Sequence, residues 1–325
     1  ELMVGALVDN VYQAWDGSII IKLRRPGEAL TFIADALGRV GLTRADYAKP
    51  STPPSFCALV RSRVRGGRVL GVEQLNMDRL VAVDVAKAGS TWRLVFELVR
   101  GFNAVLVEDS VILGCLHPRR MKDRALAPKE PYVPPPWRGL NPFTCSQAEF
   151  LEGLKRAGGR LASALVRGFN VSGEEAEEAC FKAGLSKDLR VDEVGEAEAS
   201  RLQACLKELR EEALKGELKP CVVYVDGEPA TALPFDFGSI EGRREYFESF
   251  NEALDRYFTW LRGKLEKEGR EREAERLKQR LEEVVEQQRA RMDELRREAA
   301  EKRRMAEAIM THLTVAQRAG EAAAK

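Results

Sequence analysis

The first third of the chain alternates apolar and polar residues, which is the pattern of strands that bury one face. Residues 18–23 are dense in β-branched side chains, and Gly and Pro turn signals flank them at residues 15–18 and 25–27. We therefore predict an antiparallel meander over residues 4–33. Further strands are predicted at residues 69–74, 80–85 and 92–99, followed by a hairpin at 103–108 and 111–116 that turns at Asp109-Ser110.

One amphipathic helix interrupts these strands. Pro53-Pro54 is a helix-opening signal, and Gly66-Gly67 is a helix-ending one. Between them, over residues 55–65, the apolar side chains fall on one helical face: Phe56, Leu59, Val60 and Val64. The first 117 residues are thus predicted to form a strand-rich layer with one or two helices, an α+β fold.

The middle of the chain changes character twice. Residues 128–142 hold six prolines and are predicted as an extended linker. Residues 146–216 have helical periodicity throughout, with helix stops predicted at Gly158-Gly159, Gly168, Gly184 and Gly195. Residues 221–227 then form a strand that ends in an Asp226-Gly227 turn, and we expect it to join a sheet.

From residue 243 the pattern is that of long helices. An apolar stripe rich in aromatic residues comes first, as expected of a helix docked on a domain. It consists of Phe250, Leu254, Tyr257, Phe258 and Leu261. A second stripe follows three- and four-residue steps with one extra step of four, which predicts a coiled-coil seam with a stutter. Its residues are Leu277, Leu281, Val284, Gln288, Met292, Leu295, Ala299, Ala306, Ile309 and Leu313. We expect its partner helix to come from another chain or from a segment downstream.

These patterns predict four regions. Residues 1–140 form the strand-rich domain, and residues 141–218 form a small helical domain. Residues 219–242 hold the returning strand and a linker. Residues 243–325 form the first half of a coiled-coil arm, and a homodimer through this arm is compatible with the pattern.

The distribution of charged residues along the chain indicates which domain should contact nucleic acid. The 325 residues carry a formal net charge of +1, and 32% of them are charged. Arg and Lys exceed Asp and Glu in roughly the first 150 residues, whereas the acidic residues prevail over residues 151–240. Contacts with nucleic acid are therefore expected in the first domain.

The residue inventory argues against catalysis. Only two histidines occur, His117 and His312, and neither a C-x-x-C pair nor a Gly-rich phosphate-binding motif is present. No metal or cofactor is expected. The six cysteines are scattered, as in proteins of the reducing cytosol, and are Cys57, Cys115, Cys145, Cys180, Cys205 and Cys221. No apolar run has membrane-spanning length. Because residue 1 is Glu, we expect the natural start to lie upstream, and the abundant Arg and scarce Asn favour a heat-adapted source.

Five short segments carry a family signature, in one order along the chain. They are PPSFCALVR at residues 53–61, EQLNMDR at 73–79, ELVRGFNAVL at 97–106, YVPPP at 132–136 and SFNEALDRYF at 249–258. Together they resemble the N-terminal half of the NFACT family, which includes fibronectin-binding protein A and the ribosome quality-control factors NEMF and RqcH; we expect an archaeal member. The sequence departs from the family at Phe102, inserted between Gly101 and Asn103, and it stops before the family's second conserved domain.

The resemblance implies a fold and a function. The first domain should be similar to the N-terminal domain of formamidopyrimidine-DNA glycosylases, followed by a helix-hairpin-helix-like domain and a coiled coil. Family members bind large ribosomal subunits obstructed by peptidyl-tRNA. In bacteria and archaea the full-length factor recruits alanyl-tRNA, so that the stalled chain gains an untemplated alanine tail. The ribosome makes the bond, so the resemblance implies a cytoplasmic RNA-binding factor that is not an enzyme.

The resemblance also implies site residues. The family uses the Asp-Arg pair, here Asp78 and Arg79, in tRNA engagement; Arg offers a planar fork for phosphate or a guanine edge, although a turn residue next to a surface charge is the plain alternative. Two basic clusters add candidate RNA contacts, with helix-end charges and a solvated loop as their plain alternatives. They are Arg61, Arg63, Arg65 and Arg68, and Arg119, Arg120 and Lys122.

Three interpretations remain open. In the helical domain, Glu174 and Glu175 follow the turn at residues 170–173 and would repel phosphate, so we expect that domain to be structural or to contact ribosomal protein. An enzyme of glycosylase-like fold that acts on nucleic acid is a second hypothesis, although we find no equivalent of the N-terminal proline nucleophile of those glycosylases. An adhesion protein that binds fibronectin is a third.

Overall fold

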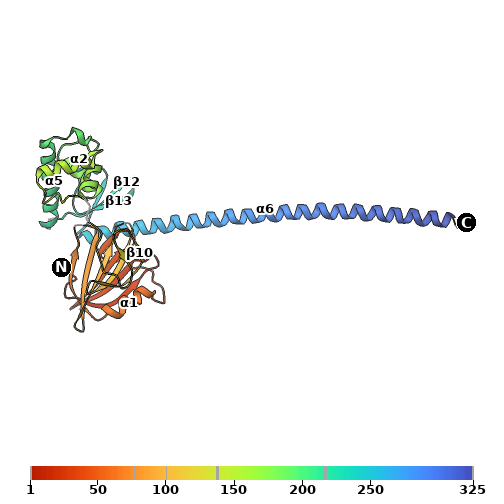
Figure 1. The fold of residues 1–325 in the computed structure, drawn as a ribbon, viewed down its shortest axis with the longest axis horizontal. Helices are drawn as coiled ribbons and strands as arrows, with labels where there is room; N and C mark the ends of the chain where they lie inside the picture. The colour runs from red at the N-terminus through yellow and green to blue at the C-terminus, as the bar shows by residue number, and fades with distance from the viewer. Residues whose placement is uncertain (1, 77, 100, 137–138, 216–217, 324–325) are drawn as a thin grey trace. The chain divides into compact units, whose positions relative to one another are not determined.

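The computed structural model describes residues 2–76, 78–99, 101–136, 139–215 and 218–323. Met77 and Arg100, which belong to two of the segments quoted above, lie outside the described residues. The chain divides into two compact units, Glu1–Trp260 and Leu261–Lys325. The described strands and shorter helices all lie in the first unit, and the described residues of the second unit belong to one helix that begins in the first unit (Figure 1).

A nine-stranded antiparallel sheet dominates the described part of the first unit. Its strand order is β4-β3-β2-β1-β5-β6-β7-β8-β9, so neighbours in the sheet are mostly neighbours in the chain. The strands are β1 (Leu7–Gln13), β2 (Ile19–Arg25), β3 (Glu28–Asp35), β4 (Arg39–Leu42), β5 (Arg68–Gln74), β6 (Leu80–Lys87), β7 (Ser90–Glu97), β8 (Asn103–Glu108) and β9 (Val111–Cys115). The predicted α+β class and the predicted strands are confirmed, with shifts of a few residues at their ends.

Both faces of the sheet carry buried side chains at strands β2 and β3, which explains the apolar runs there. In β2, Ile19 and Ile21 point into the main core, where helix α1 (Ser55–Val64) packs, whereas Ile20 belongs to a smaller cluster on the opposite face. Phe32 and Phe96 meet in the main core with ring centroids 5.4 Å apart. Strands buried on both faces lose strict alternation, so the Ile-rich run of β2 is its expected signature.

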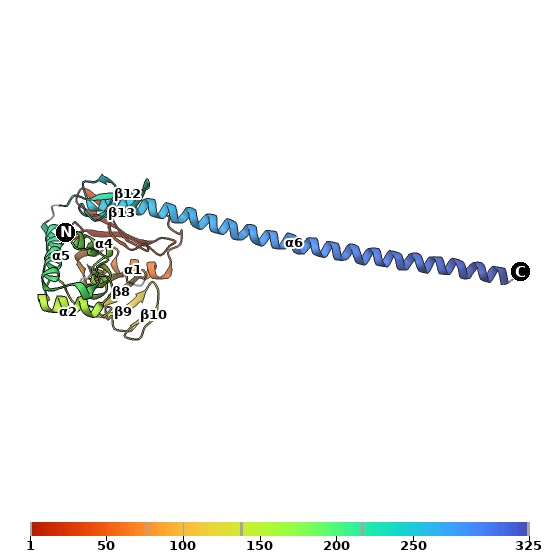
Figure 2. The same ribbon diagram turned by 90° about the horizontal axis from the view of Figure 1, so that it is seen from above.

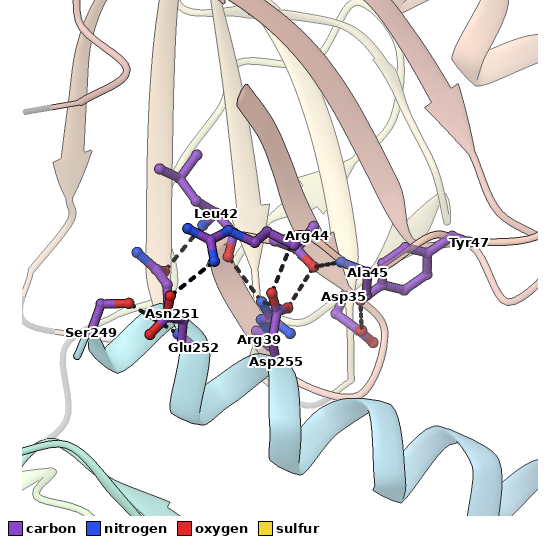
Figure 3. Close-up of polar contacts among 11 residues, drawn as sticks. Asp35, Arg39, Leu42, Arg44, Ala45, Tyr47, Ser249, Asn251, Glu252 and Asp255 are labelled. Carbon is purple, nitrogen blue, oxygen red and sulfur yellow. Dashed lines mark hydrogen bonds and ion pairs between the residues drawn. The ribbon is translucent and has the colours of Figure 1, made fainter. Parts of the chain in front are cut away.

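Strand β4 was not among the predicted elements. It has four residues, Arg-Val-Gly-Leu, and pairs with β3 from Asp35 opposite Arg39 to Phe32 opposite Leu42. A short segment with a glycine and a cation has no strand signature of its own. Its pairing is decided by the tertiary context, because the first turns of helix α6 pack against it (Figure 3).

The Pro-rich segment is extended, as predicted, but its first half is packed on the domain. A short hairpin precedes it, formed by β10 (Arg119–Arg120) and β11 (Ala125–Leu126) near β8 and β9 (Figure 2). Pro131 then forms a bridge with Val111 of β9, and Tyr132 packs on the cluster of Val95 and Val105. This stretch is therefore part of the strand-rich domain.

The helical region contains α2 (Gln147–Ala157), α3 (Leu161–Phe169), α4 (Gly173–Lys182), the 3-10 turn η1 (Val191–Glu193) and α5 (Glu196–Lys215). Phe150 and Phe169 meet in its core, with ring centroids 4.4 Å apart. The predicted stop at Gly168 is wrong, since α3 continues to Phe169 and Asn170 caps it in the left-handed conformation at φ 57°. Asn tolerates this conformation better than most residues, and it replaced Gly as the terminator.

A second sheet follows the helices. Its strands β12 (Cys221–Val225), β13 (Glu228–Leu233) and β14 (Arg243–Tyr246) pair in the order β13-β12-β14, separately from the nine-stranded sheet. Cys221 and Val223 point into the helical core, while Val222 and Tyr224 pack on Ala253 near the start of α6. The three-stranded sheet therefore lies between the helical core and the first turns of α6.

Helix α6 (Phe250–Ala323) confirms the predicted long C-terminal helix. Its seam residues, among them Leu277, Leu281 and Leu295, are more than two-fifths exposed. The coiled-coil partner stays a prediction. Among the helices that the structure describes, none is long and apolar enough to cross a membrane.

Candidate functional site

Asp78 and Arg79 lie in the tight connection between β5 and β6. The loop closes through a hydrogen bond from the Leu75 amide to the Leu80 carbonyl at 2.9 Å, and Asn76 takes a left-handed conformation at φ 54°. The Asp78 carboxylate accepts a 2.7 Å hydrogen bond from the Arg79 amide. These bonds restrain the backbone of the pair, so a ligand that contacts it would have little backbone entropy to remove.

The Arg79 backbone is also fixed by the neighbouring strand. The Leu98 amide, directly after β7, donates to the Arg79 carbonyl at 2.8 Å. The side chain of Arg79 itself is exposed, whereas Asp78 is half-buried. A cation on a fixed backbone that reaches into solvent suits contact with a phosphate group.

A hollow of about 520 Å³ opens beside this pair. Across it stand the end of α3 and the start of α4. Its lining residues are Gln74, Asp78, Arg79, Phe143, Val166, Phe169, Asn170, Val171, Ser172, Gly173, Glu174 and Glu175. The two sides differ in character, because the α4 side contributes the carboxylates of Glu174 and Glu175, whereas the β5–β6 side contributes Arg79 beside Asp78.

The start of α4 is capped by its own side chains. Ser172 accepts from the Glu175 amide at 3.1 Å, and the Glu175 carboxylate accepts from the Ser172 amide at 2.9 Å. This reciprocal capping box satisfies backbone donors that a phosphate would otherwise use. The geometry thus favours the interpretation that this turn is structural. Its contact with ribosomal protein stays a prediction.

A second hollow, of about 300 Å³, shares Asp78. Its rim includes Arg119 of the β10–β11 hairpin, and its walls include apolar atoms of Met121, Leu126 and Pro135. Arg120 and Lys122 of the same hairpin are exposed. Asp78 therefore stands between two recesses, with Arg79 at one and the basic hairpin at the other.

The four arginines from Arg61 to Arg68 differ in their exposure and in their hydrogen-bond partners. Arg61 donates twice to the Val11 carbonyl, at 3.0 and 2.6 Å, and stacks over Tyr12 with 5.3 Å to the ring centroid. Its guanidinium joins α1 to β1, which is a structural use. Arg63 is exposed, whereas Arg65 and Arg68 donate to backbone carbonyls at 3.2 and 3.1 Å from exposed positions. Among the described residues that line the two hollows, none comes from this cluster.

The sequence patterns missed one group at the site. Arg124, in the same basic stretch as Arg119, is not a surface cation: it forms an ion pair with Glu97 in which both side chains are under one-tenth exposed. Tyr132 donates to the same carboxylate at 3.0 Å. A signal existed, because Glu97 falls on the face of β7 that also carries the fully buried Val95, and an acid at an inward position needs a buried partner.

The sequence matches known proteins over most of its length. Residues 1–322 match the model of the NFACT N-terminal and middle domains. The archaeal Rqc2 homolog aRqcH of Methanocaldococcus jannaschii is 30% identical over 284 residues, which cover 83% of this chain and 41% of that protein. The human ribosome quality control complex subunit NEMF is 28% identical over 115 residues, covering 35% of this chain and 11% of that protein. The chain therefore spans less than half the length of these relatives.

The fold has a solved counterpart. The crystal structure of the fibrinogen binding protein from Staphylococcus aureus superposes with a TM-score of 0.63 at 19% identity, covering 79% of this chain and 93% of that one. At this identity the likeness establishes the fold alone. Because the family model spans nearly all of the sequence, the chain belongs to the NFACT family, of which it holds the N-terminal and middle domains.

Proposed function

We propose that this chain is the RNA-contacting part of a cytoplasmic ribosome quality-control factor. The observation that carries the proposal is the exposed Arg79 side chain on a hydrogen-bonded turn, next to the hollow that Asp78 shares with the basic hairpin. A relative named as a subunit of a ribosome quality control complex supports the cellular setting. The large subunit obstructed by peptidyl-tRNA is the proposed target.

The proposed role is binding and positioning. Arg79 and the hairpin cations Arg119, Arg120 and Lys122 contact phosphates, and Asp78 accepts from a base amine or orients Arg79. Recruitment of alanyl-tRNA for untemplated tailing is the further step that we propose for the full-length factor, with bond formation left to the ribosome. No chemistry is assigned to this chain.

The test is co-sedimentation with purified large subunits that carry peptidyl-tRNA, over a salt series. Asp78→Ala/Arg79→Ala removes one acid and one base from the site. The matched control, Glu152→Ala/Arg156→Ala, removes an exposed ion pair from α2 whose side chains are about 70% exposed. Binding that weakens with salt, falls in the site variant and persists in the control supports the proposal.

Two other outcomes contradict it in different ways. Equal binding by all three proteins would remove Asp78 and Arg79 from the contact and leave Arg63, Arg65 and Arg68 as candidates. Absence of binding by the unsubstituted chain would contradict the proposal that this part of the factor engages the subunit.

A second helix is the proposed partner of α6. The exposed side chains of Leu277, Leu281, Met292 and Leu295 follow the seam spacing, and burying them against another helix removes apolar surface from water. Sedimentation equilibrium tests the homodimer. A concentration-dependent mass that Leu281→Glu/Leu295→Glu reduces to the monomer supports it, and a monomer at all concentrations rules it out.

A further inference from the structure

Three segments of the first domain meet at the carboxylate of Glu97. Arg124 donates to both of its oxygens, at 2.6 and 2.7 Å, and Tyr132 donates to one of them at 3.0 Å. Arg124 also donates to the Val133 carbonyl at 3.0 Å. The end of β7, the basic hairpin and the Pro-rich segment are thereby joined at one buried point.

The cost of this junction argues that it does more than stabilise the fold. Removing two charges from water carries a large penalty, and apolar residues of similar volume often replace a buried ion pair without loss of stability. The Glu97 and Arg124 side chains are 3% and 8% exposed. An apolar pair cannot reproduce the directional geometry of the two hydrogen bonds. The bidentate pair holds the guanidinium in one orientation and thereby orients the hairpin that carries Arg124.

The same strand end also fixes Arg79. Glu97 is the last residue of β7, and the next residue, Leu98, donates its amide to the Arg79 carbonyl at 2.8 Å. Arg124 lies two residues after Lys122 and just before β11. The end of β7 thus holds the Asp78-Arg79 turn through its backbone and the hairpin through the Glu97 side chain.

We infer that Glu97 is a positioning residue, which holds the hairpin cations Arg119, Arg120 and Lys122 in register with Arg79 so that both engage one RNA ligand. The inference rests on the proposed function. Glu97 acts through Arg124 and does not itself touch RNA. Its contribution is to limit the orientations of the hairpin, so that less conformational entropy is lost on binding.

The decisive variant is Glu97→Leu/Arg124→Met, which replaces the buried pair by apolar side chains and avoids leaving one buried charge unpaired. The matched control is Asp84→Leu/Arg93→Met, which removes an ion pair at 2.7 Å between β6 and β7. A third protein, Arg119→Ala/Arg120→Ala/Lys122→Ala, lacks the hairpin charges. Urea denaturation, peptide-level hydrogen exchange and binding to large subunits carrying peptidyl-tRNA are measured for each.

We expect Glu97→Leu/Arg124→Met to fold with only a modestly lower midpoint of unfolding, because the Tyr132 hydroxyl loses its acceptor, while residues 117–126 exchange faster. Its affinity should fall toward that of the hairpin variant, and the slope of log K against log salt should drop by up to about 3, as for three lost phosphate contacts. Combining it with the hairpin variant should add little, because both act through the same cations. Glu97→Asp, with a shorter side chain that keeps the carboxylate, should retain part of the affinity that Glu97→Leu/Arg124→Met loses.

The inference is overturned if Glu97→Leu/Arg124→Met binds as tightly as the unsubstituted chain, or if its effect adds fully to that of the hairpin variant. Unchanged exchange of residues 117–126 would equally overturn it. If the unsubstituted chain does not bind RNA, the proposed function fails; the exchange data then show separately whether Glu97 orders the hairpin.

Discussion

Arg39 and Asp255, 216 residues apart in the sequence, form an ion pair at 2.5 Å that fastens the first turns of α6 to strand β4 (Figure 3). The Asp255 carboxylate also accepts from the Thr43 hydroxyl at 2.5 Å and from the Arg44 amide at 2.7 Å. The Arg39 guanidinium also lies over the Phe258 ring, with its Cζ atom 5.7 Å from the ring centroid. Asp255 and Phe258 both belong to the segment SFNEALDRYF, so this docking gives the signature a physical reason.

Loss of Asp255 should be costly, because the Arg39 side chain is only 1% exposed and would become an unpaired buried cation. We expect Asp255→Ala to lower the free energy of unfolding by about 3 to 5 kcal/mol. Urea denaturation measures it. The neighbouring Glu252→Ala is the control: its partner Arg44 is 87% exposed, so the loss should stay below about 1 kcal/mol. Equal losses in the two variants would contradict the assignment of Arg39 as the buried member.

Substitutions of Arg61 and Arg63 should differ in their effect on stability, although the two residues are only two positions apart on α1. Arg61→Ala removes two hydrogen bonds to the Val11 carbonyl, and we expect it to cost about 1.5 to 3 kcal/mol of stability. Arg63 is exposed, so Arg63→Ala should change stability by less than about 0.5 kcal/mol. Thermal unfolding compares the stabilities of the two variants. An unchanged melting temperature for Arg61→Ala would show that the two hydrogen bonds to Val11 are dispensable for stability.

Gly139 should not tolerate a side chain. It has φ +100°, and an added Cβ would lie 2.3 Å from the Gly168 carbonyl oxygen of α3. We expect Gly139→Ala to cost at least about 1 to 3 kcal/mol from backbone strain, with the steric clash in addition. Gly173→Ala is the matched control, since nothing lies within 4 Å of its added Cβ. Calorimetry distinguishes the two, and equal melting temperatures would refute the close approach.

Cys180 should be inert in the folded protein. Burial raises the pKa of its thiol to about 12, with the Glu177 carboxylate adding to the shift. At pH 8 we expect iodoacetamide to label it only after denaturation, which mass spectrometry of the peptides detects. Prompt labelling of Cys180 in the native protein would contradict its burial.

The same shift has a consequence for stability. The unfolded thiol has its ordinary pKa near 9.0, so above that pH the unfolded state gains a charge that the native state resists. The contribution of Cys180 to stability is therefore complete below about pH 9 and is lost as the pH rises toward 12. Cys180→Ala should flatten this part of the profile, and an unchanged alkaline slope would assign it to other groups.

Much of the fold was predictable from local pattern. The strands over residues 18–23 and 103–116, the helix at 55–65 and the long final helix all have a periodicity that matches their burial. Short or irregular parts were not. Strand β4 has only four residues. Helix α3 is capped at Asn170 instead of ending at the predicted Gly168. The Pro-rich stretch, predicted as a linker, packs on the domain through Tyr132. Each depends on contacts with segments far away in the chain.

The site shows the same division. The sequence by itself determined the α+β class, the family and the presence of cations such as Arg79, Arg119 and Arg61, because side-chain type and periodicity are local properties. Only the tertiary structure decided their use: Arg79 stands free of the core, Arg61 joins α1 to β1, and Arg124 is buried against Glu97. The physical reason is that the environment of a charge is set by neighbours distant in the sequence, and one residue type bonds equally well to a carbonyl, a carboxylate or a phosphate.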